Sequence, residues 1–129
     1  MMRAYFDSDI LIWHLRGEKK ARGFFQGVSQ NKEYEMWIGA LQRAEIVFFM
    51  KDAEEKATMS LLSQFKCAPV DQEIIDQAGK LYRKWHPGHG IDIHDAILAA
   101  TVKITGGKIY TLNVKHYPME DIIVEKPWL

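Results

Sequence analysis

The chain alternates between short apolar runs and longer stretches in which apolar residues recur every three or four positions. Short apolar runs are typical of buried strands, and the longer spacing is typical of helices with one buried face. The predicted strands cover residues 2–6, 34–38, 66–70, 108–112 and 122–124. The predicted helices run from residue 8 or 9 to 15, over 19–28, from 40 onward, and over 52–65, 72–85 and 93–104.

Polar residues and glycines mark where several of these helices begin and end. Ser8 or Asp9 can cap the first helix, because a short side-chain oxygen accepts an exposed N–H of the first turn. Asp71 and Asp92 can cap the two later helices in the same way. The segment 86–90, His-Pro-Gly-His-Gly, predicts a loop, because proline and glycine both disfavour a continuing helix.

The order of these elements predicts the fold class. Strands that alternate with helices indicate βαβ units, in which neighbouring strands run parallel and helices cover both faces of the sheet. We therefore expect an α/β fold with three layers, α/β/α, around a mainly parallel central sheet. Pro69 lacks a backbone donor, so its strand is expected at a sheet edge or to begin there. The 129 residues fit a single domain over residues 1–129.

Composition narrows the class of protein. Apolar residues make up 47% and charged residues 26% of the chain, which is ordinary for a globular protein. Cys67 is the only cysteine, which excludes an internal disulfide and fits a reducing compartment. No secretory signal and no run of ~20 apolar residues is recognisable, so we expect a cytoplasmic protein without a membrane partner. The 17 basic and 17 acidic residues cancel, which argues against binding nucleic acid through bulk charge alone but leaves a nuclease open.

Acidic and amide side chains occur where they can meet. Asp7 directly follows the first strand, and Glu45 lies on the helix after the second. Asp95 lies in the first turn of the last helix, and Asn113 follows the fourth strand. Because loops after parallel strands share one edge of a sheet, these side chains can lie in one crevice. Such oxygen donors, with positions left for water, describe a Mg²⁺ or Mn²⁺ site, which hydrolyses phosphodiesters by activating a water.

Each candidate also has an explanation that involves no chemistry. Asp9 can be only a helix cap. Asp92 and Asp95 occupy the cap and the third helical position, a pattern that capping explains by itself, although an apolar run follows Asp95 and makes it the better ligand. On spacing alone, Glu45 can be an exposed helix residue. The five histidines and Cys67 do not have the spacing of a zinc site.

Four short segments carry a recognisable pattern. Residues 92–101, DIHDAILAAT, and residues 110–117, YTLNVKHY, are similar to an acid-led helix DAxxAAT followed by TxNxxHF. Residues 7–12, DSDILI, are similar to DTSxLI with Ser8 in place of threonine, and residues 44–46, AEI, are similar to xEL. Together and in this order, the four segments resemble the PIN-domain ribonucleases, and within them the toxins of VapBC toxin–antitoxin pairs. The resemblance covers nearly the whole chain.

The resemblance implies a PIN-like fold and an endoribonuclease that depends on Mg²⁺ or Mn²⁺. It makes Asp7, Glu45 and Asp95 the metal-binding acids. Asn113 stands where the family has Asp or Asn, so it is expected to orient the phosphate or a water rather than to supply charge. Toxins of this family form dimers and are silenced by a cognate antitoxin. A homodimer and a small antitoxin are therefore the implied partners beside the RNA substrate.

Further residues are expected to support the metal ligands or to contact the substrate. They are Ser8, Asp9, Asp92, Lys115, His116 and Arg16. The hydroxyl of Ser8 can form a hydrogen bond beside the metal, and the basic residues at the rim can hold flanking phosphates.

Other interpretations of the chain stay open. A housekeeping RNA-processing PIN nuclease would use the same residues without an antitoxin. A PIN-fold RNA-binding module without catalysis is the non-enzymatic alternative, since Asn113 supplies no charge. The opening Phe6-Asp7-Ser8-Asp9 also looks like that of a haloacid-dehalogenase phosphatase, but this interpretation leaves the acid-led last helix unexplained.

Overall fold

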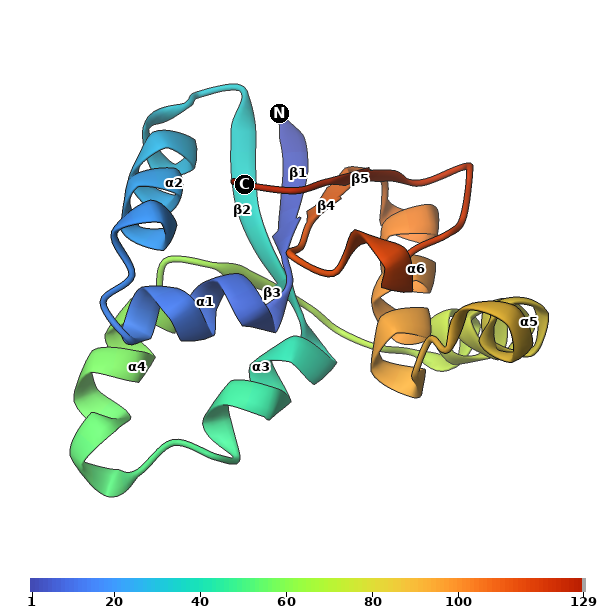
Figure 1. The fold of residues 1–129 in the computed structure, drawn as a ribbon, viewed down its shortest axis with the longest axis horizontal. Coiled ribbons are helices and arrows are strands. Elements are labelled where there is room, and N and C mark those ends of the chain that lie inside the picture. Colours follow the sequence, from blue (N-terminus) through green and yellow to red (C-terminus); the bar gives the residue numbers. More distant parts are fainter. Residues whose placement is uncertain (129) are drawn as a thin grey trace.

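A sheet of five parallel strands forms the centre of the protein in the computed structural model, which describes residues 1–128. The strands are β1 (Met2–Phe6), β2 (Tyr34–Gly39), β3 (Lys66–Ala68), β4 (Lys108–Tyr110) and β5 (Ile123–Glu125), in the spatial order β3-β2-β1-β4-β5 (Figure 1). Each of the pairings β1–β2, β1–β4, β2–β3 and β4–β5 is parallel. The expected sheet is confirmed, and β3, the strand that precedes Pro69, lies at an edge.

Helices cover both faces of this sheet, which confirms the expected three layers (Figure 1). They are α1 (Ser8–Leu15), α2 (Lys19–Gln30), α3 (Ala40–Val47), α4 (Glu55–Leu62), α5 (Gln72–His89) and α6 (Ile93–Thr105). Two short 3₁₀ turns, η1 (Asp52–Glu54) and η2 (Val114–His116), precede α4 and follow β4. Helices α1, α2 and α4 lie on one face, and α5 and α6 lie on the other. Of the helices within residues 1–128, none combines the length and the apolar character needed to cross a membrane.

The alternating side chains of β1 explain the two cores. Successive residues of a strand point to opposite faces, so Phe6 packs under α1 and α2, whereas Tyr5 packs under α5 and α6. The Phe6 ring lies 5.5 Å from that of Phe24 and 5.0 Å from that of Phe65. On the other face, residues 96–100 of α6 are all buried, so this helix is the most deeply packed against the sheet. The two layers hold β1 at the centre of the molecule.

The cap of α1 differs from the prediction. Neither Ser8 nor Asp9 caps this helix; Asp7 does, with an extended backbone (φ −69°, ψ 155°), and its Oδ1 accepts the N–H of Ser8 at 2.8 Å. Because β1 ends at Phe6 and α1 begins at Ser8, Asp7 is the single residue between strand and helix. The strand therefore passes into the helix without a loop, and the carboxyl group of Asp7 lies at the end of the sheet where the strands have their C-termini.

The prediction of a loop over residues 86–90 is wrong, because α5 continues through Pro87 to His89 and Gly90 is its C-cap. Proline lacks only one helical hydrogen bond here, in the last turn. Other contacts hold that turn: the His86 ring stacks on Tyr82 with centroids 4.6 Å apart, and His86 Nδ1 lies 2.8 Å from the carbonyl oxygen of Ile91. Gly90 then adopts the left-handed conformation (φ 63°) and ends the helix.

A close approach between β1 and the segment before β4 requires glycine. Gly107 has φ +107°, and a Cβ atom there would lie 2.4 Å from the carbonyl oxygen of Arg3. That oxygen belongs to the backbone of the central strand, so moving it away would distort the sheet. In contrast, a Cβ at Gly23 in α2 would meet nothing within 4 Å.

Replacing Gly107 by alanine is expected to lower the free energy of unfolding by about 2–4 kcal/mol, because the new methyl group adds backbone strain and a steric clash. Urea unfolding followed by circular dichroism measures the change. The control Gly23→Ala is expected to raise the free energy of unfolding by about 0.5–1 kcal/mol, since alanine favours an open helix position. Equal effects of the two substitutions would contradict this account of the β1–β4 contact.

Candidate functional site

The candidate site lies where the chain direction across the sheet reverses. From β1 the chain continues to β2 and β3 on one side, and β4 and β5 occupy the other side. In open parallel sheets this arrangement leaves a crevice at the carboxyl ends of the two strands that flank the reversal. Asp7 directly follows β1, and Thr111 directly follows β4. The Thr111 hydroxyl donates to Asp7 Oδ2 at 2.9 Å, so the two strand ends are joined inside the crevice.

Asp7 is one of two buried acids of the site, with 8% of its surface exposed. Its Oδ1 accepts the N–H of Ser8 at 2.8 Å, and its Oδ2 accepts the hydroxyls of Thr111 at 2.9 Å and Tyr117 at 3.0 Å. Burial raises the pKa of Asp7 above its usual value, these hydrogen bonds oppose the rise, and the charge of Glu45 adds to it. The carboxylate is thus well bonded but still costly to ionise.

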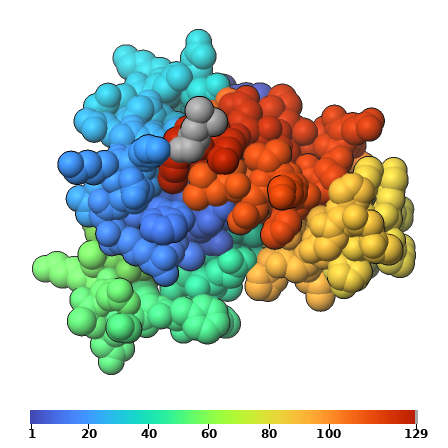
Figure 2. Space-filling view, in the orientation of Figure 1, coloured from blue at the N-terminus to red at the C-terminus, as the bar shows by residue number. Residues whose placement is uncertain are grey.

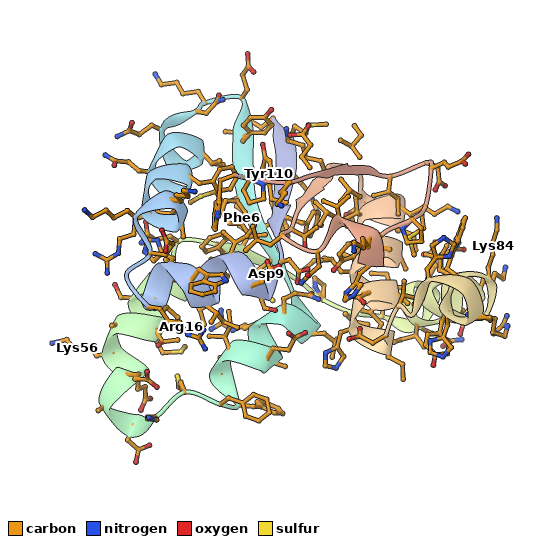
Figure 3. The ribbon with its side chains drawn as sticks, viewed as in Figure 1. Phe6, Asp9, Arg16, Lys56, Lys84 and Tyr110 are labelled. Carbon is orange, nitrogen blue, oxygen red and sulfur yellow. The ribbon has the colours of Figure 1, made fainter. Side chains whose placement is uncertain are left out.

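Asp9 extends from the first turn of α1 toward the segment after β4 (Figure 3). Its Oδ2 accepts the backbone N–H of Leu112 at 3.0 Å and the side-chain amide of Asn113 at 3.3 Å. Its Oδ1 is buried and has no hydrogen-bond partner within the described residues. Burial and the charge of Asp7 raise the pKa of Asp9 to about 6. The side chain therefore holds the Asn113 loop against α1 and leaves one polar atom unsatisfied.

Asp92 and Asp95 begin α6 as a capping box. Asp92 Oδ1 accepts the N–H of Asp95 at 2.8 Å, and Asp95 Oδ2 accepts the N–H of Asp92 at 3.1 Å. The capping interpretation of Asp92 is confirmed. Asp95 has a second environment: it is 7% exposed, and His116 Nδ1 lies 3.4 Å from its Oδ2. Burial raises the pKa of Asp95 to about 6, and the charges of Asp92 and Asp7 add to that rise. Asp95 and Asp7 therefore lie close enough to repel each other.

Glu45 projects from α3 between the ends of α1 and α6. Its Oε2 accepts the Ser8 hydroxyl at 2.7 Å, and its Oε1 lies 2.9 Å from His94 Nδ1. Gln42, one turn earlier, donates to the backbone carbonyl of His94 at 3.5 Å. The explanation of Glu45 as an unattached surface residue is therefore excluded, because both of its oxygens are bonded to neighbouring elements.

Three residues of this network were not predicted as site residues. Thr111 and Tyr117 both donate to Asp7, and His94 contacts Glu45. Tyr117 is 3% exposed, and burial together with the charges of Asp7 and Asp95 raises its pKa well above the usual value. All three were visible in the sequence as members of the segments 92–101 and 110–117, but nothing in those segments alone indicated what they contact.

The remaining predicted residues lie around the rim. Asn113 and Lys115 are exposed in the segment after β4, and His116 is half-buried beside Asp95. Arg16 is exposed at the end of α1 and, with Glu45, lines an open hollow of about 490 Å³. The space-filling view shows the face on which α1 (blue) meets α3 (teal) and α4 (green), the elements that form this hollow (Figure 2).

The chemistry of these donors fits a hard divalent cation, because carboxylate oxygens are the ligands that Mg²⁺ and Mn²⁺ prefer. The raised pKa values of Asp7, Asp9 and Asp95 and the unsatisfied Oδ1 of Asp9 indicate negative charge that lacks compensation. Within residues 1–128, however, no three His, Cys, Asp or Glu side chains are already placed to hold a metal ion together. Each oxygen of Glu45 already contacts one neighbour, Oε2 the Ser8 hydroxyl and Oε1 His94 Nδ1.

Known proteins of similar sequence and structure give this geometry a context. The sequence profile of the PIN domain matches residues 4–118. Ribonuclease VapC10 of Mycobacterium tuberculosis is 36% identical over 114 residues, which are 88% of this chain and 84% of that protein. Ribonuclease VapC19 of the same organism is 32% identical over 88% of this chain and 90% of that protein. A chain of a toxin–antitoxin complex from Klebsiella pneumoniae superimposes with a TM-score of 0.79 at 24% identity, over 97% of this chain and 98% of that one.

These matches span nearly the whole sheet and all of the segments that surround the crevice. The profile match begins within β1 and ends just after Tyr117, so it contains Asp7, Glu45, Asp95 and Asn113. With a family profile over most of its length and a relative at 36% identity, the chain belongs to the PIN domain family.

Proposed function

We propose that this protein is an endoribonuclease and the toxin of a VapBC toxin–antitoxin pair. It hydrolyses RNA phosphodiester bonds with the help of Mg²⁺ or Mn²⁺ held by Asp7, Glu45 and Asp95. The observation that carries the proposal is the gathering of acids from the junction of β1 and α1, from α3 and from α6 around one crevice, where burial and the charges of neighbouring carboxylates raise the pKa values of Asp7 and Asp95. The names of the relatives, both ribonucleases, support the RNA substrate.

The need for a cation follows from the charge of the crevice. Ionised carboxylates are expensive to bury unless opposite charge compensates them. The histidines near Glu45 and Asp95 are partly exposed and supply full positive charge only when protonated. At neutral pH, a divalent cation would offset the negative charge of the carboxylates that hydrogen bonds alone do not compensate. When bound, it also activates a water for attack on phosphorus and neutralises charge on the departing oxygen.

The protein's own residues hold and orient these groups. Thr111 and the N–H of Ser8 fix the carboxylate of Asp7, and the Ser8 hydroxyl and His94 fix that of Glu45. Asp9 and Asp92 support the site from the outside, Asp9 by holding the segment after β4 and Asp92 by capping α6.

The rim residues contact the substrate in this proposal. Arg16, Lys115 and His116 hold the phosphates that flank the scissile bond, since contacts to phosphates position a nucleic acid without reading its sequence. Asn113 orients the scissile phosphate or the attacking water. In the reaction, water adds to phosphorus, the bond from phosphorus to the leaving ribose oxygen breaks, and that oxygen takes up a proton.

The partners proposed are a second copy of the chain and a small antitoxin protein. The structurally similar chain from Klebsiella pneumoniae belongs to a toxin–antitoxin complex, which supports this assignment. A housekeeping PIN nuclease and a PIN-fold module without catalysis have the same crevice. The experiments below separate them, because the first would cut RNA without arresting growth and the second would not cut RNA.

Replacing Asp7 by Asn is expected to lower the rate of RNA cleavage at least ~100-fold, because the substitution removes a charged ligand from the cation site. Glu45→Gln is expected to act in the same direction. The measurement is cleavage of a structured RNA by purified protein with Mg²⁺ or Mn²⁺, with and without excess EDTA. Asp76→Asn, on the exposed face of α5, is the control and should leave the rate unchanged. Cleavage that persists in EDTA or in Asp7→Asn contradicts the mechanism.

Without metal, the protein is expected to lose stability as the pH rises through about 6. An acid whose pKa is higher in the folded than in the unfolded state binds more protons when folded, so its stabilising effect is present at low pH and lost above its folded pKa. Asp9 and Asp95 both have this shift, to about 6. Melting temperatures at about pH 5 to 8 in EDTA measure the loss, and added Mn²⁺ should reverse it.

The variant Asp9→Asn isolates one contribution to that pH dependence. Because asparagine does not ionise, the melting temperature of the variant should fall less than that of the unmodified protein between about pH 5 and 8. Exposed Asp76→Asn should follow the unmodified protein. Parallel curves for Asp9→Asn and the unmodified protein would show that Asp9 has no raised pKa.

Expression of the protein in a bacterial host is expected to arrest growth, whereas expression of Asp7→Asn at the same level is not. Co-expression of the small protein encoded beside it should restore growth. Growth counts and sequencing of RNA ends after brief induction test both statements. Efficient RNA cleavage by the purified protein without growth arrest would instead favour the housekeeping nuclease.

A further inference from the structure

The hydroxyl of Tyr117 lies inside the crevice although its ring belongs to the core. The residue follows η2, its backbone N–H donates to the carbonyl of Val114 at 3.0 Å, and its ring packs in the core between the sheet and α6. Its hydroxyl donates to Asp7 Oδ2 at 3.0 Å.

The hydrogen bonds of Asp7 are divided unequally between its two oxygens. Oδ2 accepts two hydroxyls, those of Thr111 and Tyr117, whereas Oδ1 accepts only the N–H of Ser8. Each carboxylate oxygen has two lone pairs to offer. Both sites of Oδ2 are therefore used, and the one acceptor site left on Asp7 is on Oδ1.

We propose that Tyr117 is a positioning residue for the metal-binding carboxylate: together with Thr111 it occupies Asp7 Oδ2, so that Asp7 presents Oδ1 alone to the divalent cation. This inference rests on the proposed function, since it assumes that Asp7 binds the cation. It goes further by stating which oxygen binds and which residue outside the acidic set decides it.

Physical reasons support a positioning role over simple packing. A tyrosine hydroxyl is protonated at neutral pH and can donate, and a hydrogen bond to a carboxylate is stronger than one between neutral groups. Tyr117 is 3% exposed, so water has little access to compete for Asp7 Oδ2. Groups that bond to a metal ligand fix its orientation, and their loss typically weakens metal affinity or activity about 10–100-fold.

The variant Tyr117→Phe separates the hydroxyl from the ring, because phenylalanine keeps the ring in the core and lacks only the hydroxyl. The matched control is Tyr5→Phe. Tyr5 is also fully buried on the α5–α6 face of the sheet, and its hydroxyl lies 2.7 Å from Thr105 Oγ1, away from the acids. Both variants lose one buried tyrosine hydroxyl, and only Tyr117→Phe loses a contact with Asp7.

Calorimetric titration of the metal-stripped protein with Mn²⁺ is the direct test. Tyr117→Phe is expected to bind Mn²⁺ about 10-fold more weakly than the unmodified protein, and Tyr5→Phe is expected to bind it equally well. In RNA cleavage at saturating Mn²⁺, Tyr117→Phe should lower kcat and leave KM for RNA unchanged, since Tyr117 contacts no substrate. Urea unfolding of the metal-free variants records any loss of stability separately.

The outcomes distinguish this inference from the proposed function. Normal Mn²⁺ binding by Tyr117→Phe overturns the inference and leaves the proposed function intact, provided that Asp7→Asn abolishes binding. Equal weakening in Tyr5→Phe also overturns it, because the effect would then follow from stability. Absence of Mn²⁺ binding by the unmodified protein overturns both. Should Tyr117→Phe fail to fold, Thr111→Val, which removes the other donor to the same oxygen, provides the same comparison.

Discussion

The concentration of negative charge at one edge of the sheet is the constraint on which the rest of the site depends. The charge of Asp7 raises the pKa of Asp95, and that of Glu45 raises the pKa of Asp7. Neither Asp7 nor Asp95 can move into solvent, because a central strand and a buried helix hold them. The polar groups around the two acids partly stabilise their negative charge. Hydroxyls of Thr111 and Tyr117 bond Asp7, and His116 lies against Asp95. These contacts lower the free-energy cost of burying ionised carboxylates without removing it. Under this condition a bound cation stabilises the site most.

Much of the fold was predictable because local patterns and the final structure agree. Apolar runs gave the five strands to within two residues at each end, and their alternation with helices gave the parallel sheet. The proposed ligands could also be selected from the sequence, for different reasons. Asp7 interrupts an apolar segment at the end of a strand. Glu45 could not be distinguished from a surface residue by spacing, and only the ordered resemblance of four segments drew attention to it.

What the sequence did not predict are contacts between distant parts of the chain. Thr111 and Tyr117 lie 104 and 110 positions from Asp7, so no local pattern connects them with it. Helix α5 continues through Pro87 for a related reason: the stacking of His86 on Tyr82 and its contact with the Ile91 carbonyl support the last turn, and breaker rules do not include such contacts. The cap of α1 was missed by one residue, because the strand passes into the helix without a loop.

The register between β1 and β4, in the middle of the sheet, determines how the side chains of the crevice are aligned. Phe6 is paired with Tyr110, so the next residues, Asp7 and Thr111, emerge side by side. A shift of the register by one position would move every side chain of β4 to the opposite face of the sheet and carry the Thr111 hydroxyl away from Asp7. The alignment of these two side chains therefore has the rigidity of the innermost strand pair. It should persist through fluctuations that loosen a peripheral element such as α4, because α4 contributes no hydrogen bond to Asp7.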